Sequence, residues 1–202
     1  MDGSRMSAEG PQPQERRSRH TKDRQQPARW VRELLDWGKT LAIALIVVLL
    51  LHVFVFNLST VEGQSMEPTL VEKEWLFVNK FVYLIGKPSH EDVVILEDPD
   101  AIPGVRDYLV KRVIGVPGDE IEIRNHQLYR NGELIIERYT DVAIDGPDLG
   151  PRVIEEGHYF VMGDNRHPRA SRDSRSFGTV PEDVIRGRAD LILWPITRIN
   201  SL

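Results

Sequence analysis

Ser65 is the first residue whose surroundings suggest chemistry. It lies within residues 61–70 (VEGQSMEPTL), where Gly63 and Pro68 flank it. Glycine and proline favour a bent, exposed backbone, which would present a hydroxyl to a substrate. A serine hydroxyl becomes an effective nucleophile only when a nearby base takes its proton. The same residues would also suit a plain linker loop, so the serine needs a partner elsewhere in the chain.

Lys111 is the candidate base. It lies in residues 108–119 (YLVKRVIGVPGD), and strand alternation would place it on one face with Leu109 and Val113. Burial on an apolar face lowers the pKa of a lysine by removing its hydration. At an ordinary pKa of about 10.4 the amine is neutral in roughly one molecule in a thousand near pH 7.4. A general base needs a pKa of about 7–8, at a cost of roughly 4 kcal/mol. The alternative is a lysine with a buried stem whose amine reaches water.

A third segment, residues 163–178 (GDNRHPRASRDSRSFG), concentrates charge between two glycines. It follows an apolar run, HYFVM, that is typical of a buried strand. The segment is either a solvated charged loop or a part of the site. Asp164, His167 and Ser171 have the residue types of a Ser-His-Asp triad. Closeness in sequence is little support for a triad, however, because the fold brings its members together.

Other kinds of site are excluded by the sequence. It contains no cysteine, which rules out cysteine nucleophiles, disulfides, iron–sulfur clusters and cysteine zinc sites. The six histidines are scattered, and no phosphate-binding loop, dinucleotide fingerprint or zinc-peptidase motif occurs. We therefore expect no metal and no organic cofactor. Residues 57–202 carry 17 Lys or Arg against 25 Asp or Glu, which argues against nucleic acid as a partner.

The N-terminal part of the chain predicts a tail and a membrane anchor. Residues 1–29 are polar and basic and predict a disordered tail. Residues 30–40 suit an amphipathic helix at a membrane interface, and residues 41–56 (LAIALIVVLLLHVFVF) contain no charged side chain. Extended to Leu58, the apolar run is roughly 27 Å long at about 1.5 Å per residue, just enough for a bilayer core. We expect residues 30–58 to form an interfacial segment plus a transmembrane helix, rather than a cleaved signal peptide or a buried core helix.

Flanking charge predicts the orientation of that anchor. Residues 21–40 hold five Lys or Arg, whereas residues 57–76 hold only Lys73. The positive-inside rule then places the N-terminus in the cytoplasm and residues 59–202 on the outer face of the plasma (inner) membrane.

Residues 59–202 predict a mainly β domain. Short apolar runs broken by Gly, Pro and Asp are typical of strands; they are EWLFVNKFVYLIG, DVVILED, YLVKRVIGV and HYFVMGD. Residues 119–139 alternate polar and apolar side chains, and Asn131-Gly132 within them is a strong signal for a type I′ hairpin turn. We expect an antiparallel β-sheet that closes as a barrel or packs as a sandwich.

In their order along the chain, these segments resemble the bacterial type I signal peptidases, or leader peptidases, in their single-anchor form. Residues 65–70 (SMEPTL) match the family's nucleophile box, and residues 111–119 (KRVIGVPGD) match its base box. Residues 90–95 (HEDVVI) are similar to its Gly-Asp-x-Val-Val box, with His-Glu in place of the leading glycine. Residues 163–166 (GDNR) and 171–175 (SRDSR) match its last box. The resemblance covers essentially the whole chain after the tail.

The resemblance implies a role for each of these residues. Ser65 would be the nucleophile, with its backbone N–H in the oxyanion hole, and Lys111 would be the general base of a Ser-Lys dyad. Ser171 would orient the lysine amine, and Asp173 and Arg175 would brace that loop. The remaining implied site residues are Arg112 paired with Asp164, and Val61, Met66, Leu70 and Val110 in the walls of shallow apolar pockets.

The implied activity is that of a membrane-anchored serine endopeptidase. It would remove signal peptides from exported preproteins by cutting after small residues in the pattern Ala-x-Ala, and its partners would be preprotein signal peptides and membrane lipid. Two features depart from the family pattern. Gly63 stands where some members have a serine that donates to the oxyanion, and residues 167–170 (HPRA) lengthen the last box by two residues. The alternative is a catalytically impaired binding module, which we would expect to lose Ser65 or Lys111 first.

Overall fold

The computed structural model of the chain describes residues 29–54, 56–102, 104 and 107–202. The tail expected over residues 1–29 lies outside the described residues except for its last residue. The elements in chain order are α1 (Arg29–Phe54), β1 (Phe56–Thr60), β2 (Trp75–Asn79), α2 (Val82–Ile85), β3 (Val93–Glu97), β4 (Tyr108–Gly115), β5 (Glu120–Arg124), β6 (Gln127–Arg130), β7 (Glu133–Leu134), β8 (Leu149–Val153), β9 (His158–Met162), α3 (Ser174–Phe177), β10 (Val180–Pro181), β11 (Ile185–Trp194) and β12 (Asn200–Ser201), with 3₁₀ turns at Glu182–Val184 and Ile196–Arg198.

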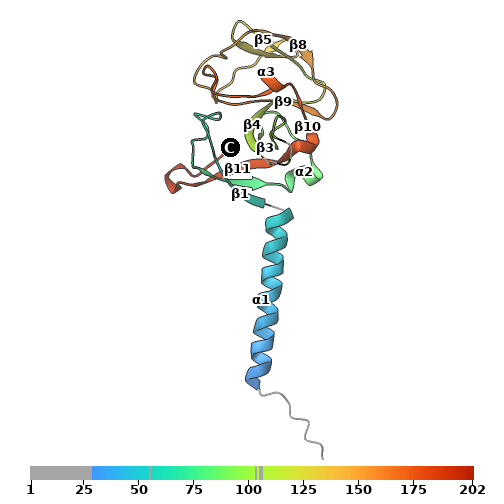
Figure 1. Cartoon of the computed structure of the whole chain (residues 1–202), viewed down its shortest axis with the longest axis vertical. Helices are drawn as coiled ribbons and strands as arrows, with labels where there is room; N and C mark the ends of the chain where they lie inside the picture. Colours follow the sequence, from blue (N-terminus) through green and yellow to red (C-terminus); the bar gives the residue numbers. More distant parts are fainter. Residues whose placement is uncertain (1–28, 55, 103, 105–106) are drawn as a thin grey trace, which may run out of the picture. The chain divides into compact units, whose positions relative to one another are not determined.

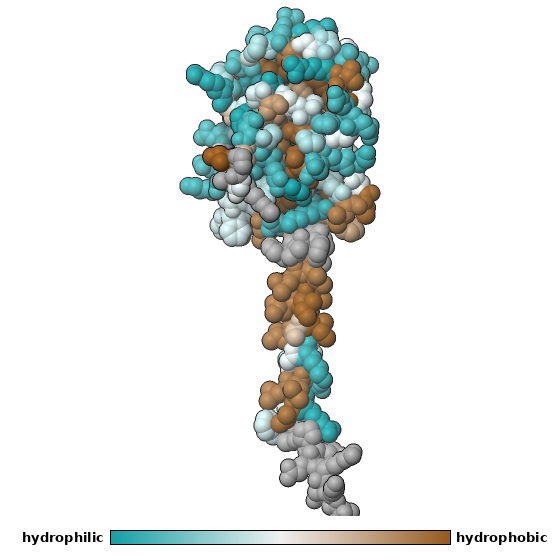
Figure 2. All heavy atoms as spheres, turned by 45° about the vertical axis from the view of Figure 1, so that its right-hand side comes forward, coloured by the Kyte–Doolittle hydropathy of each residue, from teal (hydrophilic) through white to brown (hydrophobic). Residues whose placement is uncertain are grey.

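The helix α1 joins two segments that the sequence predicts separately, because the interfacial stretch and most of the apolar run form one continuous helix. Its large apolar side chains from Leu41 to Leu50 are exposed, and Figure 2 shows them along the helix. Over the described residues, however, no helix attains the combination of length and hydropathy required of a membrane span. Residues 56–58, expected at the end of this helix, instead pair with β2 as part of β1. The chain divides within α1, after Ile43, into two compact units.

The strands that follow α1 form antiparallel sheets, as the sequence predicts (Figure 1). Among the described residues, the larger sheet has the order β1-β2-β11-β3-β4-β9-β10, with β12 beside β11, and the smaller has the order β7-β6-β5-β8. β3 is central and buries four consecutive side chains, whereas β5 alternates buried Ile121 and Ile123 with more exposed residues. A strand covered on both faces reads as a continuous apolar run, and a half-covered strand alternates.

Two turns and one short helix show how local residues shape the sheets. Asn131 and Gly132 have φ values of 54° and 79° between β6 and β7, as a type I′ turn requires, so the predicted hairpin is confirmed. Asn125 and His126 make a second positive-φ turn, between β5 and β6, which the sequence analysis did not single out. The apolar run over residues 74–86 is not one strand. It divides into β2 and α2, and the Asn79 side chain at the end of β2 accepts a hydrogen bond from the Val82 N–H at 3.2 Å.

Candidate active site

The segment around Ser65 packs onto the hydrophobic core through its own apolar side chains. Val61, Met66 and Leu70 are buried in one hydrophobic cluster with residues of β2, β3 and β11. The Leu70 N–H donates to the Met66 carbonyl at 2.9 Å, which closes a turn beyond the serine. Gly63 has a φ of +78°, a conformation that side-chain-bearing residues rarely adopt. The segment is therefore a structured turn and not a plain linker, with Ser65 half-buried at its surface.

Lys111 approaches Ser65 from the middle of β4. Its Nζ donates a hydrogen bond to Ser65 Oγ at 2.6 Å. The side chain is only 2% exposed, so the alternative of an amine that reaches water is wrong. Burial lowers the pKa of Lys111 from 10.5 to about 8. A neutral amine at this distance can accept the serine proton, which is the geometry that a Ser-Lys pair requires.

A buried carboxylate, Asp173, organises the segment beside this pair. It accepts hydrogen bonds from Ser171 Oγ at 2.8 Å, from the Gly163 N–H at 3.2 Å and from the Arg175 guanidinium. Burial acts to raise the pKa of Asp173, but the hydrogen bonds and charge of Arg175 outweigh it and hold the pKa below its ordinary value. The hydroxyl of Ser171 donates to Asp173 in this structure, and its expected contact with the Lys111 amine stays a prediction.

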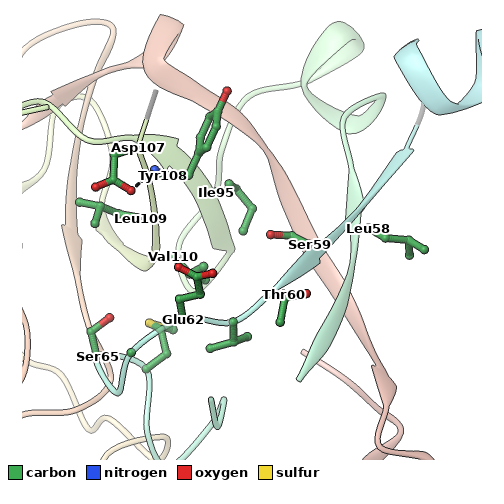
Figure 3. A pocket seen from close by; sticks show the side chains of 13 residues that line it. Leu58, Ser59, Thr60, Glu62, Ser65, Ile95, Asp107, Tyr108, Leu109 and Val110 are labelled. Atoms are coloured by element: carbon green, nitrogen blue, oxygen red, sulfur yellow. Dashed lines mark hydrogen bonds between the residues drawn. The ribbon is translucent and has the colours of Figure 1, made fainter. Parts of the chain in front are cut away.

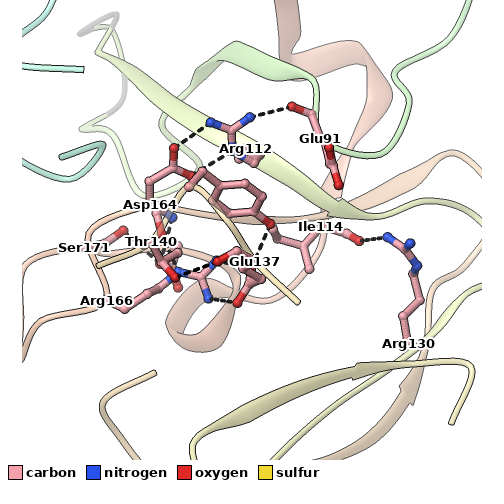
Figure 4. Close-up of polar contacts among 12 residues, drawn as sticks. Glu91, Arg112, Ile114, Arg130, Glu137, Thr140, Asp164, Arg166 and Ser171 are labelled. Atoms are coloured by element: carbon pink, nitrogen blue, oxygen red, sulfur yellow. Dashed lines mark hydrogen bonds and ion pairs between the residues drawn. The ribbon is translucent and has the colours of Figure 1, made fainter. Parts of the chain in front are cut away.

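Arg112, next to Lys111 on β4, points to the opposite side and pairs with Asp164. The guanidinium makes two hydrogen bonds to the carboxylate, at 2.9 and 2.6 Å, and a third to the Glu91 carbonyl (Figure 4). Thr69 Oγ1 donates to the same carboxylate at 2.6 Å. Asp164 thereby joins β4, which carries Lys111, to residues 61–70, which carry Ser65. Thr69 was missed by the sequence analysis because nothing in a single sequence links positions 69 and 164.

Asn165 fastens the segment around Ser65 to the rest of the domain, and Arg166 beside it fastens its own loop to Glu137. The Asn165 N–H donates to the Ser65 carbonyl at 3.1 Å, and its Nδ2 donates to the Gln64 carbonyl at 2.9 Å. Arg166 is fully buried and makes a bidentate pair with Glu137, at 3.0 and 2.6 Å (Figure 4). Glu137 was also missed, since its partner lies 29 positions away on another loop.

Gly163 lies where three parts of the site converge. A Cβ at this position would lie 2.3 Å from the Ser65 carbonyl oxygen and 2.3 Å from Ser171 Oγ. Real Cβ atoms essentially never come so close, so a side chain here would push the two serines apart. This tight packing explains why the charged segment, residues 163–178, begins with glycine.

The remaining polar candidates do not form a Ser-His-Asp triad. His167 Nε2 contacts Asp141 at 3.0 Å, and Ser171 contacts Asp173 instead. Residues 167–170 form a surface turn closed by a hydrogen bond from the Ala170 N–H to the His167 carbonyl. The part of the chain that the structure describes contains no group of three or more His, Cys, Asp or Glu arranged to hold a metal ion.

A cleft of about 420 Å³ opens beside Ser65 (Figure 3). The predicted pocket residues Val61, Met66 and Val110 line it, whereas Leu70 does not line it and is fully buried in the cluster beneath. β1 and the first part of β4 border the cleft, the lining residues being Leu58, Ser59, Thr60, Val61, Glu62, Gly63, Ser65, Met66, Ile95, Asp107, Tyr108, Leu109 and Val110. β1 is a terminal strand of its sheet, and β9 pairs with β4 only from Arg112 onward. Over the residues that the structure describes, both borders therefore present strand edges that no other strand pairs with.

Comparisons with known proteins place the chain in one family. Residues 34–194 match the family model described as "Signal peptidase, peptidase S26". The chain is 38% identical over 179 residues to Signal peptidase I P of Bacillus subtilis subsp. natto, covering 83% of this chain and 92% of that protein. It is 37% identical to Signal peptidase I S of Bacillus subtilis (strain 168), covering 84% and 94%. Signal peptidase IB of Staphylococcus aureus (strain Mu50 / ATCC 700699) is 35% identical, with the same coverage.

Proposed function

The chain belongs to the type I signal peptidase family and removes signal peptides, and on that premise we propose that Ser65 and Lys111 carry out the cleavage. The observation that carries the proposal is the 2.6 Å contact between Lys111 Nζ and Ser65 Oγ, made by an amine that is 2% exposed and has a pKa of about 8. An amine with this pKa is neutral in about a tenth of molecules at pH 7, against roughly one in three thousand at a pKa of 10.5.

The reaction proceeds in two halves through an acyl-enzyme. The neutral Lys111 amine takes the Ser65 proton as Oγ attacks the scissile carbonyl, and the resulting ammonium returns the proton to the leaving amine of the mature protein. A water molecule then attacks the ester, with Lys111 again accepting the proton, and the signal peptide leaves with a new carboxylate. The Ser65 N–H, which makes no hydrogen bond within the described part of the chain, is free to stabilise the oxyanion.

The neighbouring polar groups hold the Ser65 and Lys111 side chains in position. Asp173, braced by Arg175, holds Ser171 beside Gly163, and Gly163 contacts the serine segment. Arg112 and Asp164 tie β4 to the same segment through Thr69. Because these contacts lie on both sides of the pair, they maintain the short distance between nucleophile and base that catalysis needs. These five predicted residues, Ser171, Asp173, Arg175, Arg112 and Asp164, act as positioning residues.

The cleft supports binding of an extended peptide that has small side chains near the cut. The unpaired edges of β1 and β4 can accept a peptide as an added strand, with main-chain hydrogen bonds on both sides. Val61, Met66 and Val110 form an apolar floor close to Ser65, where bulky side chains would clash and alanine would fit. We therefore assign the substrate pattern Ala-x-Ala, with alternate side chains directed into this floor.

Membrane anchoring through α1 is the second part of the proposal. It is supported by the absence of charge between residues 41 and 56 and by the exposure of the large apolar side chains from Leu41 to Leu50. The excess of Lys and Arg over residues 21–40 favours a cytoplasmic N-terminus and an outer catalytic domain. Protease added outside sealed cells should then leave the N-terminal tail intact, and digestion of the tail would overturn this topology.

The test of the catalytic pair is cleavage of a preprotein with an Ala-x-Ala site by the detergent-solubilised chain. Ser65→Ala and Lys111→Met should abolish product, because each removes one member of the pair. Ser89→Ala and Lys87→Met, two exposed positions outside the site, are matched controls and should cut after the second alanine. Retained cleavage by a folded Lys111→Met variant would refute the assignment of the base.

A further inference from the structure

The cleft beside Ser65 is acidic at its mouth. Among the described residues that line it, Glu62 and Asp107 carry charge, and both are carboxylates (Figure 3). Both side chains are exposed. The other lining residues are apolar, or are serine, threonine, tyrosine and glycine. The lining therefore presents negative charge to a bound peptide.

Glu62 faces the open side of the cleft because its neighbour faces the core. Val61 is 3% exposed and packs in the cluster beneath the cleft, and adjacent residues of an extended segment point to opposite sides. No hydrogen bond or ion pair holds the Glu62 carboxylate within the part of the chain that the structure describes. The Asp107 carboxylate, by contrast, accepts a hydrogen bond from the Tyr108 N–H at 2.9 Å, and residues 105–106 next to it lie outside the described residues. Of the two carboxylates, Glu62 is therefore the one whose charge is more available to a bound peptide.

The same alternation applies to an extended substrate. If two alanines in Ala-x-Ala point into the apolar floor formed with Val61 and Met66, the side chain between them points the other way, toward the open side where Glu62 lies. We propose that Glu62, assisted by Asp107, selects for a cationic side chain, lysine or arginine, at the central position of the cleavage site and against an acidic one. This inference rests on the proposed function, because it assumes an Ala-x-Ala peptide bound beside Ser65.

The expected effect is modest and sensitive to salt. Both carboxylates are exposed, and solvent-exposed ion pairs typically change a rate or affinity by about 1.4- to 5-fold. Such charges are screened beyond roughly 10 Å at 0.1 M salt and beyond roughly 3 Å at 1 M salt. A preference for lysine that comes from Glu62 must therefore fall as the ionic strength rises, whereas a preference based on shape would persist.

The experiment is a competition among three substrates in one reaction. Preproteins that differ only in the central residue of the site, Ala-Lys-Ala, Ala-Gln-Ala and Ala-Glu-Ala, are mixed with the detergent-solubilised full chain, and product ratios give relative kcat/KM. The wild type should favour lysine over glutamine by about 1.4- to 5-fold and glutamine over glutamate by a similar factor. Glu62→Gln should reduce both ratios, and Glu62→Gln with Asp107→Asn should bring them close to one. Ratios cancel any general change in activity.

A matched control separates the cleft from net charge. Glu133→Gln removes one carboxylate from β7 in the smaller sheet and should leave the ratios as in the wild type. Equal cleavage of the three substrates by the wild type would overturn the inference and leave the proposed function intact. A lysine preference that persists in the double variant, or that is unchanged at high salt, would also overturn it. Failure to cut any substrate after the second alanine would instead overturn the proposed function.

Discussion

Replacing Lys111 by methionine should make the folded protein more stable while it removes activity. The pKa of Lys111 falls from 10.5 to about 8 because the amine is buried. Below pH 8 the folded chain must hold a buried ammonium that the unfolded chain would expose to water. At about 1.4 kcal/mol for each pH unit between the two pKa values, this costs the fold about 3 kcal/mol at pH 7. Methionine has a similar shape and carries no charge, so it avoids the cost.

The dependence on pH distinguishes this effect from changes in packing. Because the folded pKa lies below the unfolded pKa, the unfolded chain binds more protons between pH 8 and 10.5, and wild-type stability rises with pH over that range. The advantage of Lys111→Met should accordingly shrink by about 3 kcal/mol between pH 7 and about pH 10.5. Packing changes contribute a constant that does not depend on pH.

Urea unfolding of the wild type and Lys111→Met in detergent, followed by tryptophan fluorescence at several pH values, measures this difference. Other titrating groups are common to both chains and cancel. Lys87→Met makes the same substitution at a side chain that is 62% exposed and is the matched control. A Lys111→Met difference that stays constant from pH 7 to 10 would refute the claim that burial depresses the pKa of this amine.

Three further outcomes follow from the site geometry. Since only the neutral Lys111 amine accepts the serine proton, kcat/KM should rise about tenfold from pH 7 to pH 9, and a flat pH–rate profile would contradict its role as base. Gly163→Ala should lower kcat by about 100-fold in a preprotein cleavage assay, because its Cβ would lie 2.3 Å from the Ser65 carbonyl oxygen; near-normal activity would show that this contact is relaxed easily. Thr69→Val should lower the free energy of unfolding by about 2 kcal/mol in urea denaturation, because Asp164 loses a 2.6 Å hydrogen bond, and Thr69→Ser should restore most of it.

The β architecture was predictable because its signals are local. Alternation over residues 119–139 and the Asn131-Gly132 pair depend on neighbours within a few positions. The pair makes the predicted turn and the alternation appears in β5, β6 and β7, although residues 135–139 at its end are not in a strand. The same local reasoning was wrong over residues 74–86, where β2 ends at Asn79 and the short helix α2 begins at Val82. It was also wrong at residues 56–58, because these residues pair with residues 77–79 of β2, and the apolar run before them carries no sign of that pairing.

The sequence by itself determined the residue types of the site, namely a serine between glycine and proline, a lysine within an apolar strand and a charged segment that begins with glycine. It also determined that cysteine chemistry is absent. Only the tertiary structure decided which of these residues meet, because Ser65 and Lys111 lie 46 positions apart and Thr69 and Asp164 lie 95 apart. It likewise decided that Lys111 is buried and that Leu70 lies beneath the cleft. Alternation assigns a side chain to one face of a strand, but burial and contact arise when distant segments pack against that face.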